Sequence, residues 1–398
     1  MKEKFLRELA DIQTGPFGSQ LHKEDYVADG TPIVTVEHLG NKMFSEQNLP
    51  RVSNTDKNRL KKYVLKQGDI VFSRVGSVDR CSYVDQKHDG WMFSGRCLRV
   101  RPTSEIDSEY LYYYFCLEET KQFVRNIAVG ATMPSINTKL LGEVVVTFPE
   151  LEQQKRISGI LSAIDSKIEV NQKINDNLEQ QAAALFKSWF VDFSLFGGTV
   201  PENWEDTTLE NITTLITRGI APKYSNDSDQ TVINQKCIRN HTIDLSLARS
   251  HTPKAINEKW LQFGDLLINS TGDGTLGRVA QVWFTPKSLT VDSHVTIVRP
   301  AREELIFYIG LWGILHEKEI ESLHTGSTGQ TELPRDRVKM LKLLLPDNIS
   351  LSRFNSIIAP MASTIILNQE ESQKLASLRD TLLPKLMSGE IDVSSIQL

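Results

Sequence analysis

The stretch Leu65–Ser73, with the sequence LKQGDIVFS, occurs a second time in the chain as Leu261–Asn269, LQFGDLLIN. Three further segments return in the same order at an interval of about 197 residues. They are Val100–Pro102 with Val298–Pro300, Gly130–Thr132 with Gly326–Thr328, and Val144–Pro149 with Leu341–Pro346. Solenoid repeats are only about 20 to 50 residues long, so this interval indicates two complete modules in tandem.

Each module begins with a long segment in which short apolar runs, rich in Val, Ile, Thr and aromatic residues, are broken by Gly, Pro, Asn and Asp. This pattern is typical of a mixed, strand-rich globular domain. The two segments are residues 1–149 and 194–349. A chain of 398 residues is too long for one ordinary core, which agrees with at least two domains.

Each strand-rich segment is followed by the pattern of a long helix, in residues 150–193 and again in 350–398. In both helices apolar residues recur on a seven-residue series with an asparagine at its centre. The series are Ile157, Ile164, Asn171, Leu178 and Leu185 in the first helix, and Phe354, Met361, Asn368, Leu375 and Leu382 in the second. In the second helix Ser350 is the expected N-cap, Pro360 is expected to kink the first turns, and Pro384 is expected to end or bend the helix.

A helix of this length with one apolar stripe needs a partner helix, and the only similar segment in the chain is the other copy. We expect the two helices to pair as an antiparallel coiled coil, with the globular domains at opposite ends. Buried asparagines fix the register of such seams, so Asn171 is expected beside Asn368. The other residues expected in the pairing are Ile164, Leu178, Met361 and Leu375. The alternative is that both asparagines face solvent where the stripe is interrupted.

The composition excludes several classes of protein. With 40% hydrophobic and 24% charged residues, the chain is neither collagen-like nor wholly disordered. Four cysteines without metal-ligand spacing argue against a disulfide scaffold or a zinc ribbon, and they fit a reducing cytoplasm. The first residues contain no apolar core of signal-peptide length, and no later run approaches the length of a membrane span. A net charge of −5 argues weakly against a free-standing nucleic-acid binder.

One motif in the sequence imitates a cofactor site. Gly272, Gly274 and Gly277 spell GxGxxG after an apolar strand, but Ala280–Phe284 has the pattern of another strand and not of the helix that a dinucleotide site requires. A turn between two strands is the simpler interpretation. No methyltransferase tetrapeptide, P-loop or nuclease motif stands out, so we expect no catalytic residues and no metal site.

The segments at the helix ends resemble conserved regions of a known family. The first helix begins with PELEQQKRI at Pro149–Ile157 and ends with LFKSWFVDF at Leu185–Phe193, and the second ends with LLPKLMSGEI at Leu382–Ile391. Together with the two Gly-Asp strands, these segments resemble the specificity subunit (S, or HsdS) of type I restriction-modification systems. The resemblance extends over essentially the whole chain.

The resemblance implies an α+β chain with pseudo-twofold cyclic organisation and no catalytic residues of its own. Two target recognition domains, 1–149 and 194–349, each read one half of a split DNA target, while the conserved helices 150–193 and 350–398 set the spacer and dock two methyltransferase (HsdM) subunits. It further implies that S-adenosylmethionine binds to the partner subunits, and that two restriction (HsdR) subunits, which use ATP and Mg, can join the complex. The second hypothesis is a structural scaffold that recruits proteins through its helices without reading DNA.

For contact with DNA we favour polar residues in loops, because Arg binds guanine or phosphate and because Ser and Asn read base edges. After the two Gly-Asp strands these are Ser73, Arg74, Arg80, Asn269, Ser270 and Arg278. Further candidates are Gly15, Ser19, Arg218 and Lys223 in the N-terminal loops, and Thr132 and Gln330 in the later loops. The alternatives are solvated arginines paired with Asp79 or Asp273, and loops that are only structural turns.

Trp189 and Phe190, at the end of the first helix, are candidates for partner docking. Burial of these rings against the adjacent domain is the alternative, since aromatic residues on an apolar stripe usually pack.

Overall fold

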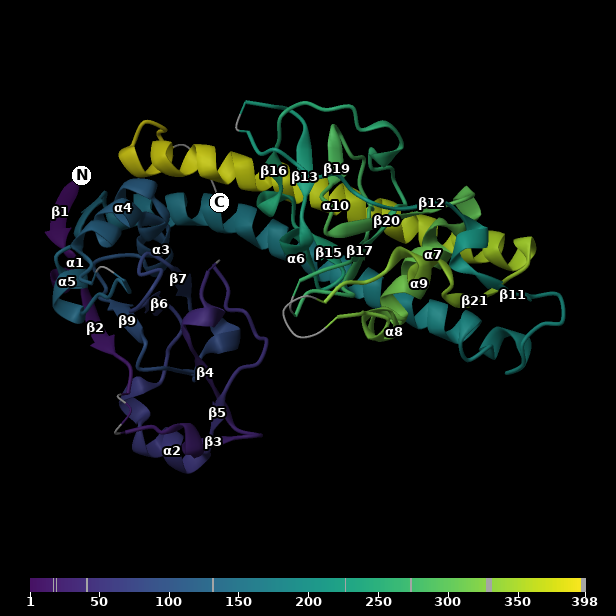
Figure 1. Cartoon of the computed structure of the whole chain (residues 1–398). Coiled ribbons are helices and arrows are strands. Elements are labelled where there is room, and N and C mark those ends of the chain that lie inside the picture. Colours follow the sequence, from purple (N-terminus) through teal and green to yellow (C-terminus); the bar gives the residue numbers. More distant parts are fainter. Residues whose placement is uncertain are drawn as a thin grey trace. The chain divides into compact units, whose positions relative to one another are not determined.

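A computed structural model describes residues 1–398 apart from Phe17, Ser19, Asn41, Ala131, Asn226, Asp273, 327–330 and 395–398. The contacts within the chain divide it into two units (Figure 1). Unit 1 consists of Met1–Val170 and Glu371–Leu398, and unit 2 consists of Asn171–Glu370. Each unit therefore contains one strand-rich segment and a part of each long helix. The four sequence modules 1–149, 150–193, 194–349 and 350–398 stay a prediction.

The centre of unit 1 is a four-stranded antiparallel sheet of order β2-β9-β6-β7. Its strands are β2 (Ala10–Thr14), β9 (Cys97–Pro102), β6 (Ile70–Ser73) and β7 (Cys81–Tyr83). The helix α3 (Ser108–Cys116) packs on this sheet, and α4 (Glu118–Ile127) follows it. Phe72 of β6 meets Phe115 of α3 edge to face, with 4.7 Å between the ring centroids, so the main core of the unit lies between sheet and helix.

Shorter elements complete unit 1. A second layer of order β3-β5-β4-β8 has its own core and is built from β3 (Tyr26–Val27), β5 (Arg51–Val52), β4 (Thr31–Val34) and β8 (Met92–Phe93). The short helices are α1 (Leu6–Leu9), α2 (Asn54–Arg59) and α5 (Thr138–Gly142). The first strand, β1 (Lys2–Phe5), pairs antiparallel with β10 (Val145–Phe148), which fixes the start of the chain just before the first long helix.

Unit 2 repeats this plan around an antiparallel sheet of order β12-β20-β17-β18. Its strands are β12 (Thr213–Arg218), β20 (Val295–Pro300), β17 (Leu266–Asn269) and β18 (Val279–Gln281). The other elements are α7 (Ile306–Leu315), α8 (Glu317–Ser322), α9 (Arg335–Lys339), the pair β11 (Glu205–Thr208) with β21 (Lys342–Leu345), and the short strands β13 (Thr231–Ile233), β14 (Ile238–Arg239), β15 (Thr242–Ile243), β16 (Arg249–Ser250) and β19 (Leu289–Val291). The predicted α+β class and the predicted duplication are therefore confirmed.

The Gly-Asp pair of the repeated motif fixes a turn and a strand pairing in unit 1. Gly68 has a φ of +90°, a conformation that glycine adopts without a steric penalty. The carboxylate of Asp69 is buried, accepts the Lys66 N–H at 2.7 Å, and receives two hydrogen bonds from Arg101 at 2.7 and 2.6 Å. Because an arginine fork fixes both position and orientation, the motif ties the turn before β6 to the end of β9.

Unit 2 forms the same arrangement with the second copy of the motif. Gly264 has a φ of +89°, and Asp265 accepts the Gln262 N–H at 2.8 Å. Arg299 donates two hydrogen bonds of 2.8 Å to the Asp265 carboxylate. In each unit, the repeated Gly-Asp segment thus provides the aspartate, and the repeated Val-Arg-Pro segment the arginine, of one buried ion pair.

The two long helices are α6 (Leu151–Phe190) and α10 (Asn348–Ser388). Asp347 accepts the backbone N–H groups of Ile349 at 2.9 Å and Ser350 at 3.0 Å. The prediction that Ser350 is the N-cap is therefore wrong, because Asp347 already satisfies the free N–H groups of the first turn. Pro360 and Pro384 both lie inside α10, so Pro384 does not end this helix.

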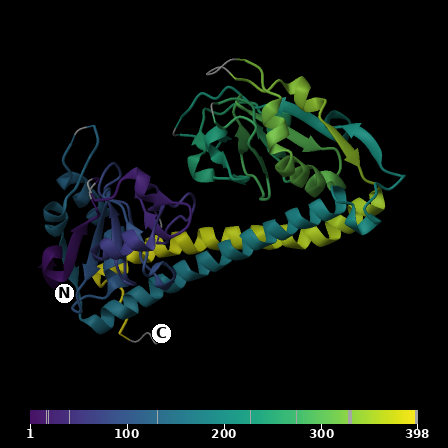
Figure 2. The same cartoon turned by 90° about the horizontal axis from the view of Figure 1, so that it is seen from below.

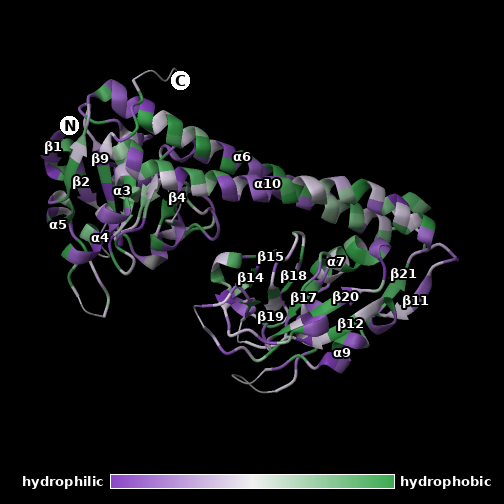
Figure 3. Cartoon of the chain, turned by 90° about the horizontal axis from the view of Figure 1, so that it is seen from above, coloured by the Kyte–Doolittle hydropathy of each residue, from purple (hydrophilic) through white to green (hydrophobic). Residues whose placement is uncertain are grey.

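The two long helices run antiparallel within unit 1. Asp165 contacts Arg379 at 2.8 Å and Lys167 contacts Glu371 at 3.1 Å, so advancing along α6 corresponds to going back along α10. Figures 1 and 2 show the two helices side by side, and Figure 3 shows apolar and polar residues alternating along them, as amphipathic partners require. The predicted antiparallel pairing is confirmed. The placement of the two domains at opposite ends stays a prediction.

Three asparagines meet where α6 and α10 pair in unit 2. Asn171 is buried, and its amide nitrogen lies 3.4 Å from the carbonyl oxygen of Asn368. Asn368 donates to Asn175 Oδ1 at 2.8 Å, and Asn175 donates to the carbonyl of Ile365 at 3.4 Å. The structure thus places Asn171 against Asn368 and adds Asn175 to the pair. The four other residues expected in the pairing, Ile164, Leu178, Met361 and Leu375, are half-buried.

Candidate functional site

Three loops of unit 1 converge at the end of β6, where the first candidates lie. The Arg74 N–H donates to the Arg96 carbonyl at 2.8 Å, and the Gly76 N–H donates to the Pro134 carbonyl at 2.8 Å. We call this surface the loop edge of unit 1, and it comprises residues 74–80, 94–96 and 129–135, of which Ala131 is outside the described residues. Neighbouring strands of the sheet hold these loops together, so residues far apart in sequence form one surface.

The three candidates after β6 differ in exposure. Ser73 is buried, and its hydroxyl donates to the Val75 carbonyl at 2.7 Å, so it stabilises the loop. Arg74 is half-buried, with Nη1 donating to the Gly95 carbonyl at 3.0 Å. Arg80 is exposed, and its guanidinium lies beside Gly40, where a Cβ would meet Nη2 at 2.8 Å.

Unit 2 has an equivalent edge. The Asn269 N–H donates to the Arg278 carbonyl at 2.9 Å, and the Ser270 N–H donates to the His294 carbonyl at 2.8 Å. The Leu333 N–H in turn donates to the Ser270 carbonyl at 2.8 Å. The described parts of residues 270–278, 292–294 and 325–333 form the loop edge of unit 2.

Two of the three candidates after β17 are buried beneath this edge. Asn269 donates its amide N–H to the Gln235 carbonyl at 3.0 Å, and the Ser270 hydroxyl lies 2.6 Å from the Thr296 hydroxyl. Arg278 is half-buried, with Nη2 donating to a backbone carbonyl at 2.6 Å. Only Arg278 among them offers polar atoms to a ligand.

The N-terminal loops contribute one exposed candidate. A Cβ at Gly15 would lie 2.1 Å from the Ser94 carbonyl oxygen, so Gly15 is needed for the close approach of two backbone segments. Arg218 forms an ion pair of 2.6 Å with Glu332 and is half-buried. Lys223 is exposed.

The observed burial of the candidate residues reduces the number that can contact DNA directly. The buried residues Gly15, Ser73, Asn269 and Ser270, and the ion-paired Arg218, support the loops, and their burial argues against direct contact with bases. The residues with exposed or half-exposed side chains are Arg74, Arg80, Thr132, Lys223 and Arg278. Ser19 and Gln330 lie outside the described residues.

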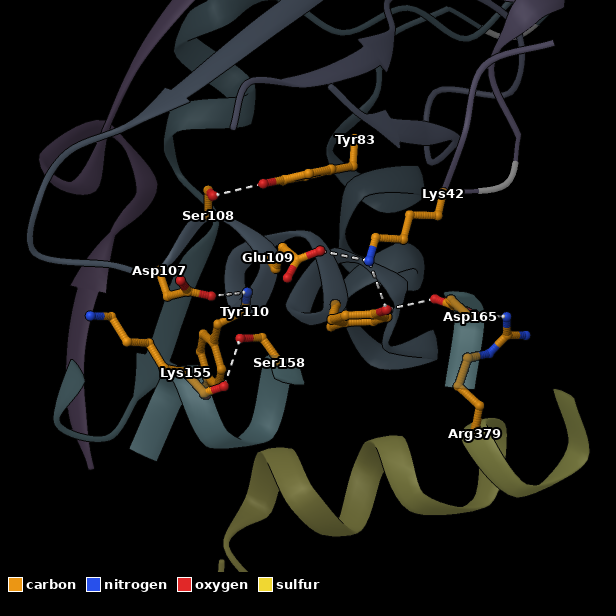
Figure 4. Close-up of polar contacts among 11 residues, drawn as sticks. Lys42, Tyr83, Asp107, Ser108, Glu109, Tyr110, Lys155, Ser158, Asp165 and Arg379 are labelled. Atoms are coloured by element: carbon orange, nitrogen blue, oxygen red, sulfur yellow. Dashed lines mark hydrogen bonds and ion pairs between the residues drawn. The ribbon is translucent and has the colours of Figure 1, made fainter. Parts of the chain in front are cut away.

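A polar network that the sequence patterns did not reveal connects the strand-rich domain of unit 1 to the long helices (Figure 4). Lys42 donates to Glu109 at 2.7 Å and to the Tyr113 hydroxyl at 3.2 Å. Tyr113 donates to Asp165 of α6 at 2.6 Å, and Arg379 of α10 donates to the other oxygen of Asp165 at 2.8 Å. Asp165 therefore joins three elements at one point.

Burial and charge govern this network. Burial, assisted by the Asp165 carboxylate, raises the pKa of the Tyr113 hydroxyl, so Tyr113 remains a hydrogen-bond donor. Burial opposes the charge of Arg379, but its hydrogen bonds and ion pairs with Asp165 and Asp380 raise the pKa of its guanidinium. The sequence repeat could have drawn attention to the pair, because Asp165 and Arg379 align with two buried alanines, Ala362 and Ala182, in the other copy.

Trp189 and Phe190 pack inside unit 2. Both rings are 8% exposed, and each contacts the ring of Phe354 on α10, at centroid distances of 5.6 and 4.8 Å. Trp204 and Tyr308 add further ring contacts to Phe190. This burial favours the alternative that the two rings pack within the chain, and it argues against a docking surface formed by them.

The glycine motif after β17 is a turn, as predicted. Gly272, Gly274 and Gly277 all have positive φ and lie between the antiparallel strands β17 and β18. Among the described residues, no group of three or more His, Cys, Asp or Glu side chains is arranged to hold a metal ion. Of the helices described, none combines the length and apolar character that a membrane span requires.

The sequence and the fold are similar to those of one group of proteins. A family model described as "Type I restriction modification DNA specificity domain" matches residues 1–180. The chain is 27% identical over 323 residues to the type I restriction enzyme MjaIX specificity subunit of Methanocaldococcus jannaschii, covering 75% of this chain and 72% of that protein. It is 23% identical over 412 residues to the HindI specificity subunit of Haemophilus influenzae, covering 83% and 88%.

A solved structure supports the same assignment at the level of the fold. The S subunit of a type I restriction-modification system from M. genitalium aligns with a TM-score of 0.57 at 16% identity, covering 97% of this chain and 95% of that one. The similarity thus spans both units. With the sequence matches, it shows that the chain is similar to type I restriction-modification specificity subunits.

Proposed function

We propose that the two strand-rich domains of this chain read the two halves of one bipartite DNA target. This proposal rests on one observation: the two units share the same buried scaffold but carry different loops. The buried pairs Asp69–Arg101 and Asp265–Arg299 have the same geometry in both units. The loops that follow differ, with Arg74 in one copy and Ser270 at the equivalent position in the other. Two unlike surfaces on one scaffold suit two unlike half-sites.

We further propose that α6 and α10 set the spacer between the half-sites and dock two methyltransferase subunits. Each helix contributes to both units, so a change in helix length acts on both recognition domains together. S-adenosylmethionine then belongs to the partner subunits, as do ATP and Mg where two restriction subunits join. A cytoplasmic location agrees with four cysteines that are all free thiols.

Deleting or inserting one heptad within residues 160–185 tests the role of the helices. We expect a changed spacer, or lost binding, with each half-site preference kept, because residues 1–149 and 194–349 keep their sequence. The target is determined by sequencing methylated DNA. An unchanged spacer with full activity contradicts this part of the proposal.

The competing hypothesis is a scaffold that recruits proteins without reading DNA. The unlike loops that follow the two like sheets favour DNA reading, because a protein scaffold has no need for them. Single-molecule methylome sequencing of a host with and without the gene tests the proposal and gives both half-sites and the spacer. If random DNA competes with the assembled complex as well as the methylated sites do, the recognition proposal fails.

A further inference from the structure

Unit 1 carries a row of three arginines across the ends of adjacent strands. Arg74 follows β6, and its N–H donates to the carbonyl of Arg96, which precedes β9. On the other side, the Ser73 N–H donates to the carbonyl of Arg80, which precedes β7, at 2.9 Å. Since hydrogen-bonded strands lie about 4.8 Å apart, the three arginine backbones fall within roughly 10 Å of one another. We call Arg96, Arg74 and Arg80 the arginine row.

The same hydrogen bonds identify the equivalent positions in unit 2. His294 takes the place of Arg96, Ser270 the place of Arg74, and Arg278 the place of Arg80. Ser270 is buried, while His294 is exposed and lies 2.6 Å from the Thr271 hydroxyl through Nδ1. Unit 2 thus keeps one arginine where unit 1 has three.

Two of the three arginines in the row present their charge to solvent. Arg80 and Arg96 are exposed, and their side chains form no hydrogen bond or ion pair with any residue that the structure describes. Asp79, the carboxylate adjacent to Arg80 in sequence, is paired instead with Arg125 at 2.6 Å. In unit 2 the Arg278 guanidinium donates to the Gly274 carbonyl, which occupies part of its donor set.

From this difference we infer that the two units hold DNA by different chemistry. The arginine row binds DNA phosphates or guanine edges and gives the half-site of unit 1 most of the charge-dependent affinity of the complex, whereas unit 2 reads its half-site mainly through groups other than arginine, such as Thr271 and His294. The inference rests on the proposed function and goes beyond it, because bipartite reading by itself requires no difference between the halves. Arginine is suited to both ligands, since its planar fork matches phosphate and guanine.

Salt dependence tests this inference. Each phosphate contact contributes about 0.9 to the slope of log K against log salt concentration, while contacts of uncharged groups contribute little. We expect the Arg80→Gln/Arg96→Gln variant, assembled with its methyltransferase subunits, to lose about 1 to 2 from this slope and at least tenfold in affinity at about 100 mM salt. Arg278→Gln is the comparison in unit 2, and we expect it to lose less slope than the double variant, because the Gly274 carbonyl already accepts a hydrogen bond from this guanidinium.

Binding is measured by fluorescence anisotropy on three DNA duplexes, namely the methylated target found by sequencing, the same target with the unit 1 half-site scrambled, and a random sequence. Thermal melting of each assembled complex shows whether a variant is folded. The variant Arg80→Lys/Arg96→Lys, which keeps the charge, is expected to restore the slope. A loss of preference for the intact half-site in that variant assigns the row to guanine, and a kept preference assigns it to phosphate.

Two outcomes overturn the inference. One is a slope that is unchanged in the folded Arg80→Gln/Arg96→Gln complex, and the other is an equal loss of slope in Arg278→Gln. Either result leaves the proposed function intact as long as the parent complex still prefers its target. If the parent complex binds random DNA as tightly as the target, the proposed function itself fails.

Discussion

At the start of α10, the carboxylate of Asp347 accepts hydrogen bonds from three residues. The backbone N–H groups of Ile349 and Ser350, the Ser350 hydroxyl at 2.7 Å and the Trp204 indole N–H at 2.8 Å all donate to its carboxylate. Burial opposes ionisation, but these donors lower the pKa of Asp347 to about 2. One side chain thus links the long helix to the segment before β11 and makes the stability of unit 2 depend on pH.

The direction of this dependence follows from the lowered pKa. An unfolded aspartate has a pKa of about 3.9, so the stabilising effect of Asp347 is fully present above about pH 4 and is lost as the pH falls through about 2. We expect Asp347→Ala to cost about 1 kcal/mol of unfolding free energy at neutral pH and to flatten the acid dependence between these values. Urea unfolding of both proteins at pH 2.5 and pH 5 provides the measurement. A parallel loss of stability in variant and parent on acidification would contradict the assignment.

Single residues also show what sequence could and could not reveal. The roles of Asp69 and Asp265 follow from repetition, because a motif kept in two otherwise diverged copies marks the scaffold. The burial of Ser73 and Asn269 did not follow, since hydroxyl and amide groups are as common in exposed loops as in buried turns. Only the strand pairing that places them under the loops decides between these positions.

At the scale of elements, the long helices were predictable from periodicity, whereas the polar contacts between them were predictable only in part. Asn171 and Asn368 stand out because they interrupt an apolar series, and they do meet. Asn175 lies off that series and escaped notice, although it is 3% exposed and bonds to Asn368. Asn175 interrupts the second apolar row of the helix, Leu161, Ile168, Ala182 and Trp189, which lies four residues on from the first, so the sequence could have marked it as well.

A double-mutant cycle tests the asparagine contact. Asn175→Leu and Asn368→Leu each leave one amide side chain without its hydrogen-bond partner in the seam, while the double variant removes both amide groups. We therefore expect the two effects on unfolding free energy to couple by about 0.5 to 3 kcal/mol. Strictly additive effects, measured by urea denaturation, would show that the two residues act independently. Ile174→Leu, on an exposed position of the same helix, serves as the control.

The Asp165–Arg379 pair gives a sharper test, because the other copy of the repeat provides its own apolar version. Arg379→Ala leaves Asp165 nearly buried without its ion pair, which typically costs about 3 to 5 kcal/mol. The double variant Asp165→Ala/Arg379→Ala reproduces the alanines found at the aligned positions of unit 2, and we expect it to be more stable than Arg379→Ala. Hydrogen exchange of amides in α3 and in residues 371–388 reports on this part of unit 1. Equal exchange in the single and double variants would contradict the role of the buried charge.

At the scale of the whole molecule, the fold could be predicted because the sequence is duplicated. Two copies with matching order define the modules, and the helix pattern defines the partner segments. The length of the repeat could not reveal that contacts within the chain divide each long helix between two units, because that division depends on which residues pack together in space. The loop edges could not be predicted from the sequence either, since the three sequence-distant loops of each edge meet only after the sheets form.

Modular recognition leads to one prediction about the complete molecule. Replacing residues 1–149 by the corresponding domain of another family member should change one half of the DNA target and leave the other half and the spacer as they were. The scaffold supports this exchange, because β10 leads directly into α6 and the Asp69–Arg101 pair lies entirely within the exchanged segment. The Tyr113–Asp165 contact crosses the junction, so the replacement must carry a tyrosine at that position, and a matched chimera with phenylalanine there measures the cost of losing the contact. Methylome sequencing of cells that express each chimera gives the target directly. A change in both halves would mean that the two domains do not read DNA independently.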